Sequence, residues 1–331
     1  MQLEGTMLLR RTDVEDLVSL KDCISAVEEI LRLQGEGEVP GSAILGVTAE
    51  RGGLHVKAVL LPGEKSYFVA KLNTNFPDND PEFELPTIQG LILLCDTKNG
   101  APLALLDSID VTIKRTAAAS AVAAKYLARL NSCVGIVCGC GQQARTQLRA
   151  IHSVRPLKKL YAFDRNERAT KIFAFELADE LQLEIEPVDN LRPALRKSDI
   201  CVTCTTSREF FVRKEHVSPG TFIAAVGADD KHKQEIDPAL MASARVVVDS
   251  LDQCCAIGDL HHAISQGLMG RENVYAELCE IVAGRKPGRT SEDEIIVFDS
   301  TGVAIEDAVT AATIYEKARA AKTGSHFNFS A

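Results

Sequence analysis

The sequence predicts an α/β protein in which a doubly wound parallel sheet is joined to a smaller α+β domain. In the second half of the chain, short apolar runs alternate with helical segments, which is the pattern of a parallel sheet covered by helices. Earlier in the chain, short apolar runs are separated only by Gly, Pro and Asn turns. With 331 residues, of which 46% are hydrophobic and 25% charged, the chain is long enough to bury two cores.

The first domain is expected to open with a helix over residues 12–34, because an apolar stripe at helical spacing follows the capping candidates Thr12 and Asp13. Strands in one twisted sheet are then expected at 44–47, 55–60, 67–72, 88–94 and 104–107. This segment has too little sequence to place helices on both faces of the sheet. We therefore expect a second subunit to cover one face or edge.

An Ala-rich helix over 116–130 leads into the second domain. Six strands separated by helices are expected there, at 134–138, 160–163, 200–203, 222–226, 246–249 and 295–299. The last helix, about 303–320, has no strand left to pair with in that sheet, so we expect it to return to the first domain. The expected domains are 1–117 with 305–331, and 118–304, with the chain frayed from Lys322 onward.

A glycine-rich turn after the strand at 134–138 is the most informative motif. Gly139 permits a tight turn, and Gly141 lets the backbone approach a pyrophosphate whose charge lies at the N-terminus of the next helix. Ala144 takes the place of a third glycine, and Asp164 ends the next strand, where a carboxylate accepts the ribose hydroxyls of an adenosine. The motif predicts a Rossmann dinucleotide-binding domain; the alternative is an ordinary glycine-rich turn between strand and helix.

Asp164 also bears on the choice of cofactor. A carboxylate at this position repels a 2′-phosphate and favours NAD(H), whereas Arg165 and Arg168 would accommodate that phosphate, so NADP(H) is the less favoured alternative. No set of metal ligands is visible in the sequence, and no metal is expected. The residues expected to contact the cofactor are Thr116, Gly139, Gly141, Gln142, Gln143, Ala144, Asp164, Arg165, Thr203, Thr205, Val226, Ser300 and Gly302.

Isolated basic residues form a second group of candidate site residues. Lys57 and Lys71 interrupt apolar strands, and Lys114 with Arg115 is expected to open the helix at Thr116. A lysine in a buried pattern usually has a partner or a function, and Arg115 can hold a carboxylate with two hydrogen bonds. The alternatives are surface lysines with buried stems and, for Arg115, a salt bridge that caps the helix or links the domains.

An acidic pair, Asp229 and Asp230, follows the strand at 222–226, at the end where ligands of such sheets bind. We expect Asp229 to face the amino or imino nitrogen of a substrate whose carboxylate is held by Lys71, Arg115 and Lys57. Such a layout suits hydride transfer at the Cα of an amino acid, with Asp229 and Lys71 as the catalytic candidates. The alternative is that Asp229 only caps the following turn and takes no part in catalysis.

Several motifs in order along nearly the whole chain resemble the ornithine cyclodeaminase/mu-crystallin family. They are Lys71, 100–107 (GAPLALLD), 112–118 (TIKRTAA), 139–144 (GCGQQA), 225–229 (AVGAD) and 298–302 (FDSTG). The resemblance implies a homodimer built through the first domain and an active site in the cleft between the domains. It also implies that Lys71 and Arg115 contact the substrate carboxylate and that Asp229 is the acid/base.

The chain departs from this family in two places. Many members have an arginine after the proline near position 40, where this chain has Pro40-Gly41-Ser42, and many have Met-Pro-Ala where it has Val56-Lys57-Ala58. Lys57 either compensates for the missing arginine or belongs to a pocket for another substrate. The resemblance therefore does not fix the substrate.

Three functions are compatible with these residues. The first is an NAD(H)-dependent oxidoreductase at the C–N bond of an amino or imino acid, which is an amino-acid dehydrogenase or imine reductase. The second is a cyclodeaminase that uses bound NAD catalytically and releases ammonia. The third, a non-catalytic binding protein like mu-crystallin, is disfavoured because Lys71, Arg115 and Asp229 are all present.

The composition of the chain limits the classes of binding partner and the cellular compartment that we expect. The net charge of −9 argues against a nucleic-acid or anionic-membrane surface. No apolar run approaches the length of a membrane span, and the N-terminus lacks the signature of a signal peptide. Most of the ten cysteines lie in apolar runs, and the pair Cys201 and Cys204 sits in a strand rather than a redox motif. These features predict a cytoplasmic protein.

Overall fold

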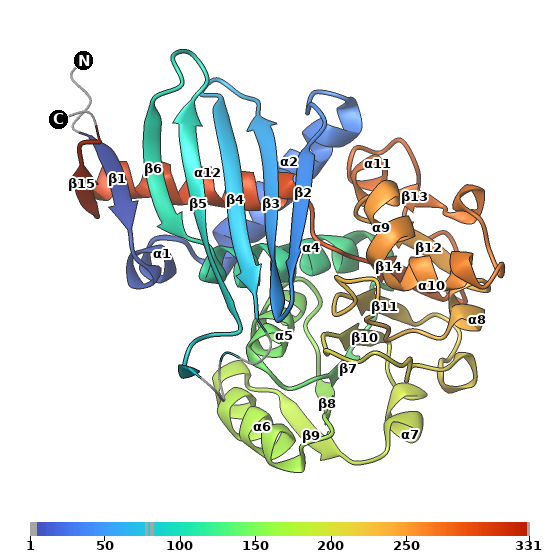
Figure 1. Cartoon of the computed structure of the whole chain (residues 1–331). Helices are drawn as coiled ribbons and strands as arrows, with labels where there is room; N and C mark the ends of the chain where they lie inside the picture. Colours follow the sequence, from blue (N-terminus) through green and yellow to red (C-terminus); the bar gives the residue numbers. More distant parts are fainter. Residues whose placement is uncertain (1–4, 77–78, 80–82, 330–331) are drawn as a thin grey trace. The chain divides into compact units, whose positions relative to one another are not determined.

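The computed structural model describes residues 5–76, 79 and 83–329, which fall into two units (Figure 1). Unit 1 comprises Met1–Arg115 with Ala304–Ala331, and unit 2 is the continuous segment Thr116–Val303. The sequence analysis expected domains at 1–117 with 305–331 and at 118–304. The last helix belongs to unit 1, as its position after the final strand indicated.

Unit 1 is built on a mixed sheet with seven strands in its described residues, in the order β15-β1-β6-β5-β4-β3-β2. Neighbours are antiparallel except β1 and β6. The strands are β1 (Thr6–Leu9), β2 (Ala43–Ala49), β3 (Gly52–Leu61), β4 (Tyr67–Asn75), β5 (Ile88–Asp96), β6 (Pro102–Asp107) and β15 (Ser325–Phe327). The expectation of a frayed tail is wrong, because β15 pairs with β1, with Thr6 opposite Phe327.

The helices of unit 1 are α1 (Arg11–Leu17), α2 (Leu20–Glu36) and α12 (Ala304–Ala321), and α4 (Ile109–Leu127) begins in this unit. The single helix expected over 12–34 is wrong. Ser19 Oγ accepts a hydrogen bond from the Asp22 N–H (3.2 Å) and the Asp22 carboxylate accepts one from the Ser19 N–H (3.0 Å), so a reciprocal cap starts a new helix. The α4 start is also earlier than expected, which places Lys114 and Arg115 in its second turn.

The two faces of this sheet differ. In β4, Tyr67, Val69 and Lys71 are buried on the face that α12 covers, whereas Phe68 and Leu72 are 47% and 43% exposed on the other face. Figure 1 shows α12 running across the sheet behind β3 to β6. The exposed apolar residues that share the opposite face are called the outer face: Leu45, Val47, Phe68, Leu72 and Leu91.

Unit 2 is a doubly wound parallel sheet, which confirms the expected fold class. Its described residues give the strand order β13-β12-β14-β11-β10-β7-β8-β9. The strands are β7 (Val134–Cys138), β8 (Lys159–Phe163), β9 (Glu184–Val188), β10 (Ile200–Thr203), β11 (Phe222–Ala225), β12 (Arg245–Val248), β13 (Ala276–Glu277) and β14 (Ile296–Asp299). The sequence prediction missed β9, an edge strand that contains Pro187, and the two-residue β13.

Helices connect the strands of unit 2. They are α5 (Gln142–Val154), α6 (Glu167–Leu181), α7 (Leu191–Leu195), α8 (Pro238–Met241), α9 (Leu251–Ile257), α10 (Asp259–Ser265) and α11 (Leu278–Val282), with 3₁₀ turns at Lys214–His216 and Arg271–Asn273. The chain passes from β7 to β8 on one side and returns to β10 on the other, so the strand order reverses between β7 and β10. Ligands of such sheets bind outside the carboxyl ends of the strands at this point. Among the described helices, none has both the length and the apolar character needed to cross a membrane.

Candidate active site

The glycine loop lies at the point where the strand order of unit 2 reverses. Gly139 has a φ of 91°, and a Cβ there would lie 3.0 Å from the Cys204 carbonyl oxygen, so only glycine fits both the turn and the contact. Gly141 is the N-cap of α5, and a Cβ on it would meet no described atom within 4 Å. The loop therefore leaves open space at the N-terminus of a 13-residue helix, where a pyrophosphate fits.

Asp164 closes this loop from the end of β8. Its carboxylate accepts hydrogen bonds from the Cys140 N–H and the Asn166 N–H, each at 2.8 Å. The side chain is half-buried, and a carboxylate with two such bonds keeps lone pairs for further donors. Arg165 beside it is exposed, and Ala144 is fully buried under the loop.

Four further expected cofactor contacts surround two acids that the sequence analysis missed. The hydroxyls of Thr203 and Thr205 each donate to the Glu235 carboxylate at 2.7 Å, and Thr203 is fully buried. The Asp249 carboxylate accepts from the hydroxyl of Ser300 (3.1 Å) and from the Gly302 N–H (2.5 Å). These acids fall in or beside turns, where neither helical nor strand periodicity identifies them.

Unit 1 brings Lys71 and Arg115 together around two buried carboxylates. Lys71 Nζ lies 2.8 Å from Asp307 Oδ1, and Arg115 donates from Nε to the same oxygen (3.0 Å) and from Nη1 to Glu306 (2.9 Å). All four side chains are at most 7% exposed. Glu306 and Asp307 occupy the first turn of α12, and the signal that identifies them in the sequence is an acidic pair in an otherwise apolar helix start.

Lys57 adds a third cation to this cluster. It lies directly opposite Lys71 in the β3–β4 pair, where like charges repel unless carboxylates separate them. Burial lowers the pKa of Lys71 to about 8, against the opposing effect of Asp307, and Arg115 and Lys57 lower it further. Although burial alone would raise it, Arg115 and Lys71 lower the pKa of Asp307 below its ordinary value. Lys71, Arg115 and Lys57 thus bring three cations to the two carboxylates, and basic side chains grouped in this way suit the binding of a carboxylate group.

Two further candidates have ion-pair partners within their own units. Asp229 follows β11 in unit 2, is 51% exposed, and forms an ion pair with Lys233 at 2.5 Å. Lys114 pairs with Asp110 at 2.8 Å and donates to main-chain carbonyls of α1 and the residue after it, so it fixes the start of α4.

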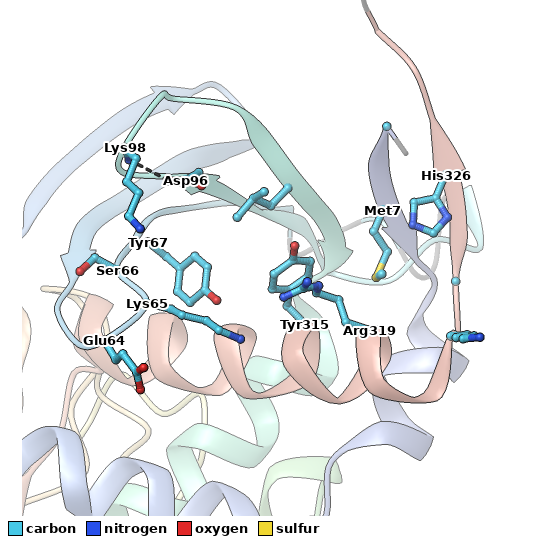
Figure 2. Close-up of a pocket in the computed structure, with 14 residues that line it drawn as sticks. Met7, Glu64, Lys65, Ser66, Tyr67, Asp96, Lys98, Tyr315, Arg319 and His326 are labelled. Atoms are coloured by element: carbon cyan, nitrogen blue, oxygen red, sulfur yellow. Dashed lines mark hydrogen bonds between the residues drawn. The ribbon is translucent and has the colours of Figure 1, made fainter. Parts of the chain in front are cut away.

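A cavity of about 680 Å³ also lies in unit 1, but its lining includes neither Lys71 nor Arg115 (Figure 2). It is lined by Tyr67, Tyr315 and Arg319, among others. At 1.5 Å per residue, Tyr315 and Arg319 are roughly 12 and 18 Å further along α12 than Asp307. Lys65 and Arg319 in its lining are both paired with Glu316. The cluster at the start of α12 therefore remains the candidate substrate site of unit 1.

The fold and these residues define a doubly wound α/β protein that carries a glycine loop at its switch point and, in a separate unit, a buried cationic cluster. The sequence model of the ornithine cyclodeaminase/mu-crystallin family matches residues 4–322. The chain therefore belongs to this family.

Characterised relatives match over nearly the full length. Alanine dehydrogenase of Archaeoglobus fulgidus is 38% identical over 325 residues, which are 98% of each chain. An archaeal alanine dehydrogenase dimer with bound NAD superposes with a TM-score of 0.94 at 38% identity, covering 98% of this chain and 99% of that one. The Δ¹-pyrroline-2-carboxylate reductase of Thermococcus litoralis, solved with NADH and L-proline, has a TM-score of 0.90 at 37% identity and covers 97% and 100%.

Proposed function

We propose that this protein is an NAD(H)-dependent oxidoreductase that acts on the C–N bond of an amino or imino acid. The observation that carries this proposal is the buried cluster of Lys71 and Arg115 around Glu306 and Asp307, whose basic side chains can bind the carboxylate of a substrate. The relatives named above support the reaction class, since they are an amino-acid dehydrogenase and an imino-acid reductase.

The glycine loop supports the choice of cofactor. We infer that Gly139, Gly141 and the first turn of α5 hold the pyrophosphate, and that Asp164 accepts the ribose hydroxyls. Bound NAD(H) would supply the hydride acceptor or donor. Asp164 disfavours a 2′-phosphate, so binding titrations should give a lower Kd for NADH than for NADPH. The reverse order would mean that Arg165 decides the preference.

The chain's own residues position the substrate and move the proton. Arg115 and Lys71 hold the carboxylate, and Lys57 adds positive charge beside it. When hydride leaves Cα, the nitrogen must also lose a proton, and Asp229 accepts it; in the reductive direction Asp229 returns it.

We also propose that the protein forms a homodimer through unit 1. The outer face exposes five large apolar side chains on three strands of one sheet, β2, β4 and β5, which a monomer in water rarely does. The archaeal relative is a dimer. For the compartment we propose the reducing cytoplasm, since all ten cysteines lie in the described residues as free thiols.

A substrate panel tests the function. Small amino acids, the matching 2-oxo acids with ammonia or amines, and cyclic imino acids would be assayed with both cofactors, scoring NADH absorbance and ammonia. A dehydrogenase or reductase changes the absorbance at 340 nm in proportion to product. Ammonia release without net absorbance change would instead show a cyclodeaminase. No turnover and no cofactor binding would contradict the proposal.

A further inference from the structure

We propose that Glu235 is a positioning residue that links the loops after β10 and β11 and thereby places Asp229 and the cofactor-facing side of unit 2. Its kinetic consequence rests on the proposed function, but its structural basis does not. Glu235 is fully buried in unit 2 and lies six residues beyond Asp229.

The four hydrogen bonds of the Glu235 carboxylate come from two neighbouring strand ends. Oε1 accepts the N–H and the hydroxyl of Thr205, both at 2.7 Å. Oε2 accepts the Thr203 hydroxyl (2.7 Å) and the Gly227 N–H (2.9 Å). Thr203 ends β10 and Gly227 follows β11, so one side chain joins the carboxyl ends of adjacent parallel strands.

Both linked loops lead to residues of the proposed site. The Asp229 N–H donates to the Gly227 carbonyl (3.1 Å), so the segment that carries Asp229 starts at a residue held by Glu235. On the other side, a Cβ at Gly139 would lie 3.1 Å from Thr205 Cγ2, so the Thr205 loop packs directly against the glycine loop. A shift of the Glu235 side chain would therefore displace both the segment that carries Asp229 and the loop that carries Thr205.

The main chain of Glu235 is itself held by the start of helix α10. Asp259 Oδ1 accepts the N–H groups of Glu235 (2.8 Å) and Ile236 (2.9 Å). The first residues of α10 in turn donate to Asp299 at the end of β14, through the N–H groups of Asp259 (3.3 Å) and Leu260 (2.9 Å). This support fixes where the carboxylate of Glu235 sits before any ligand binds.

The pattern of donors requires a carboxylate rather than an amide. Each oxygen of Glu235 accepts one backbone N–H and one hydroxyl. A hydroxyl can rotate toward another acceptor, but a backbone N–H cannot. In Glu235→Gln the amide NH₂ therefore faces a fixed N–H in either orientation, and one loop loses its anchor.

The first test is independent of activity. Hydrogen exchange of the Thr205 and Gly227 amides is followed in the apo protein; in Glu235→Gln we expect one of them to exchange about tenfold or more faster. The Val226 amide, which donates to the Thr203 carbonyl in the sheet, should keep its rate. Unchanged exchange at both Thr205 and Gly227 would overturn the proposal.

The second test is kinetic. We expect Glu235→Gln to lower kcat by about 10- to 100-fold, because a displacement near 1 Å at a reacting group costs that much. The NADH Kd should rise, whereas the substrate KM should change less because unit 1 holds the carboxylate. Leu240→Ala is the matched control: it removes a fully buried side chain of the same core, which lowers Tm, but leaves all four donors to the Glu235 carboxylate in place. An equal loss of kcat in Leu240→Ala would reduce Glu235 to a merely stabilising residue.

A milder pair of variants keeps the proposal testable if Glu235→Gln does not fold. Thr203→Val removes one donor to Glu235 Oε2, so we expect the Gly227 amide, which donates to the same oxygen, to exchange several-fold faster in the apo protein, whereas Thr203→Ser keeps the hydroxyl and should keep the wild-type rate. Equal exchange of the Gly227 amide in the two variants would contradict the proposal. Faster exchange without turnover on any substrate would instead contradict the proposed function and leave the positioning role standing.

Discussion

Arg115 has two tasks that substitutions can separate. It is proposed to hold the substrate carboxylate, and it is a counter-ion of the buried Glu306 and Asp307. Arg115→Lys keeps the charge but loses the paired hydrogen bonds, so we expect KM to rise about 10- to 100-fold with a smaller loss of Tm than in Arg115→Ala. Arg115→Ala should raise KM at least as much and also lower Tm, because a broken buried pair costs about 3–5 kcal/mol. Normal KM in Arg115→Lys would exclude Arg115 from carboxylate binding.

Lys71 gives the protein a pH-dependent affinity. Because burial lowers its pKa to about 8, the ammonium is lost as the pH rises through that value, and the attraction for a carboxylate falls with it. We expect KM to rise between pH 7 and 9 in the wild type. Lys71→Arg, which stays charged, should flatten this profile, whereas Lys71→Ala should impair both KM and kcat. A wild-type KM constant over this range would contradict the assignment.

Asp229 is tested with its neighbour as the control. Asp229→Asn keeps the shape but removes the base, and we expect kcat to fall by about 10² to 10⁴ with NADH affinity nearly unchanged. Asp230 is equally exposed to solvent, and its carboxylate accepts the His232 N–H. Asp230→Asn should therefore turn over normally. The opposite result for the two variants would move the acid/base role to Asp230.

At the level of single residues, the sequence identified the basic side chains of the site but not the carboxylates that pair with them. Lys71 and Arg115 were visible because a cation in an apolar pattern is unusual. Glu306 and Asp307 lie about two hundred positions further along the chain, and only the return of α12 to unit 1 brings them to Arg115. Glu235 was missed because it lies in an irregular segment, where hydrophobic periodicity carries no information about the side chain.

At the level of secondary-structure elements, the outer face of the sheet in unit 1 leads to a prediction about dimer formation. Leu72 lies in the row Leu45, Val56, Leu72, Leu91 across four strands. Leu72→Asp places a charge in the middle of the proposed interface, so we expect light scattering to show a shift from dimer to monomer at micromolar concentration. Phe175→Asp in α6, which removes an even more exposed aromatic ring from unit 2, should leave the dimer intact. A monomeric wild type would refute the interface.

A second prediction concerns the contribution of strand β15 to stability. It covers the edge of β1, and Gly5 and Gly324 sit where a Cβ would clash with the opposing strand. Removal of residues 324–331 leaves β1 paired on one side only, so we expect Tm to fall and aggregation on heating to increase. Ending the chain at residue 328 should have little effect. Equal Tm for both truncations would show that β15 adds no stability.

Three of the four strands missed from the sequence share a physical cause. β1, β13 and β15 have two to four residues, too few for a two-residue period to stand out. β15 also pairs with a strand more than 300 positions away. The break between α1 and α2 depends on a reciprocal cap at Ser19, and the apolar stripe continues through it.

At the scale of the whole molecule, the division into two units was predictable because the repeated strand–helix alternation starts and stops at definite points. The two crossings between units fall within two positions of those inferred from the sequence. The exposed face of unit 1 was predictable too, since so few residues remain to cover its sheet. The register of each sheet was not, because cross-strand partners are set by packing rather than by composition.

The return of the last helix to unit 1 also orders events during synthesis. A ribosome releases the strands of unit 1 first, then all of unit 2, and only afterwards the residues of α12 and β15 that complete the first sheet. Unit 2 is continuous, so it can finish folding while the nascent strands of unit 1 still lack the helix that buries their inner face. Until then both faces of that sheet are apolar and uncovered, which makes the nascent chain a natural client for chaperones at the tunnel exit.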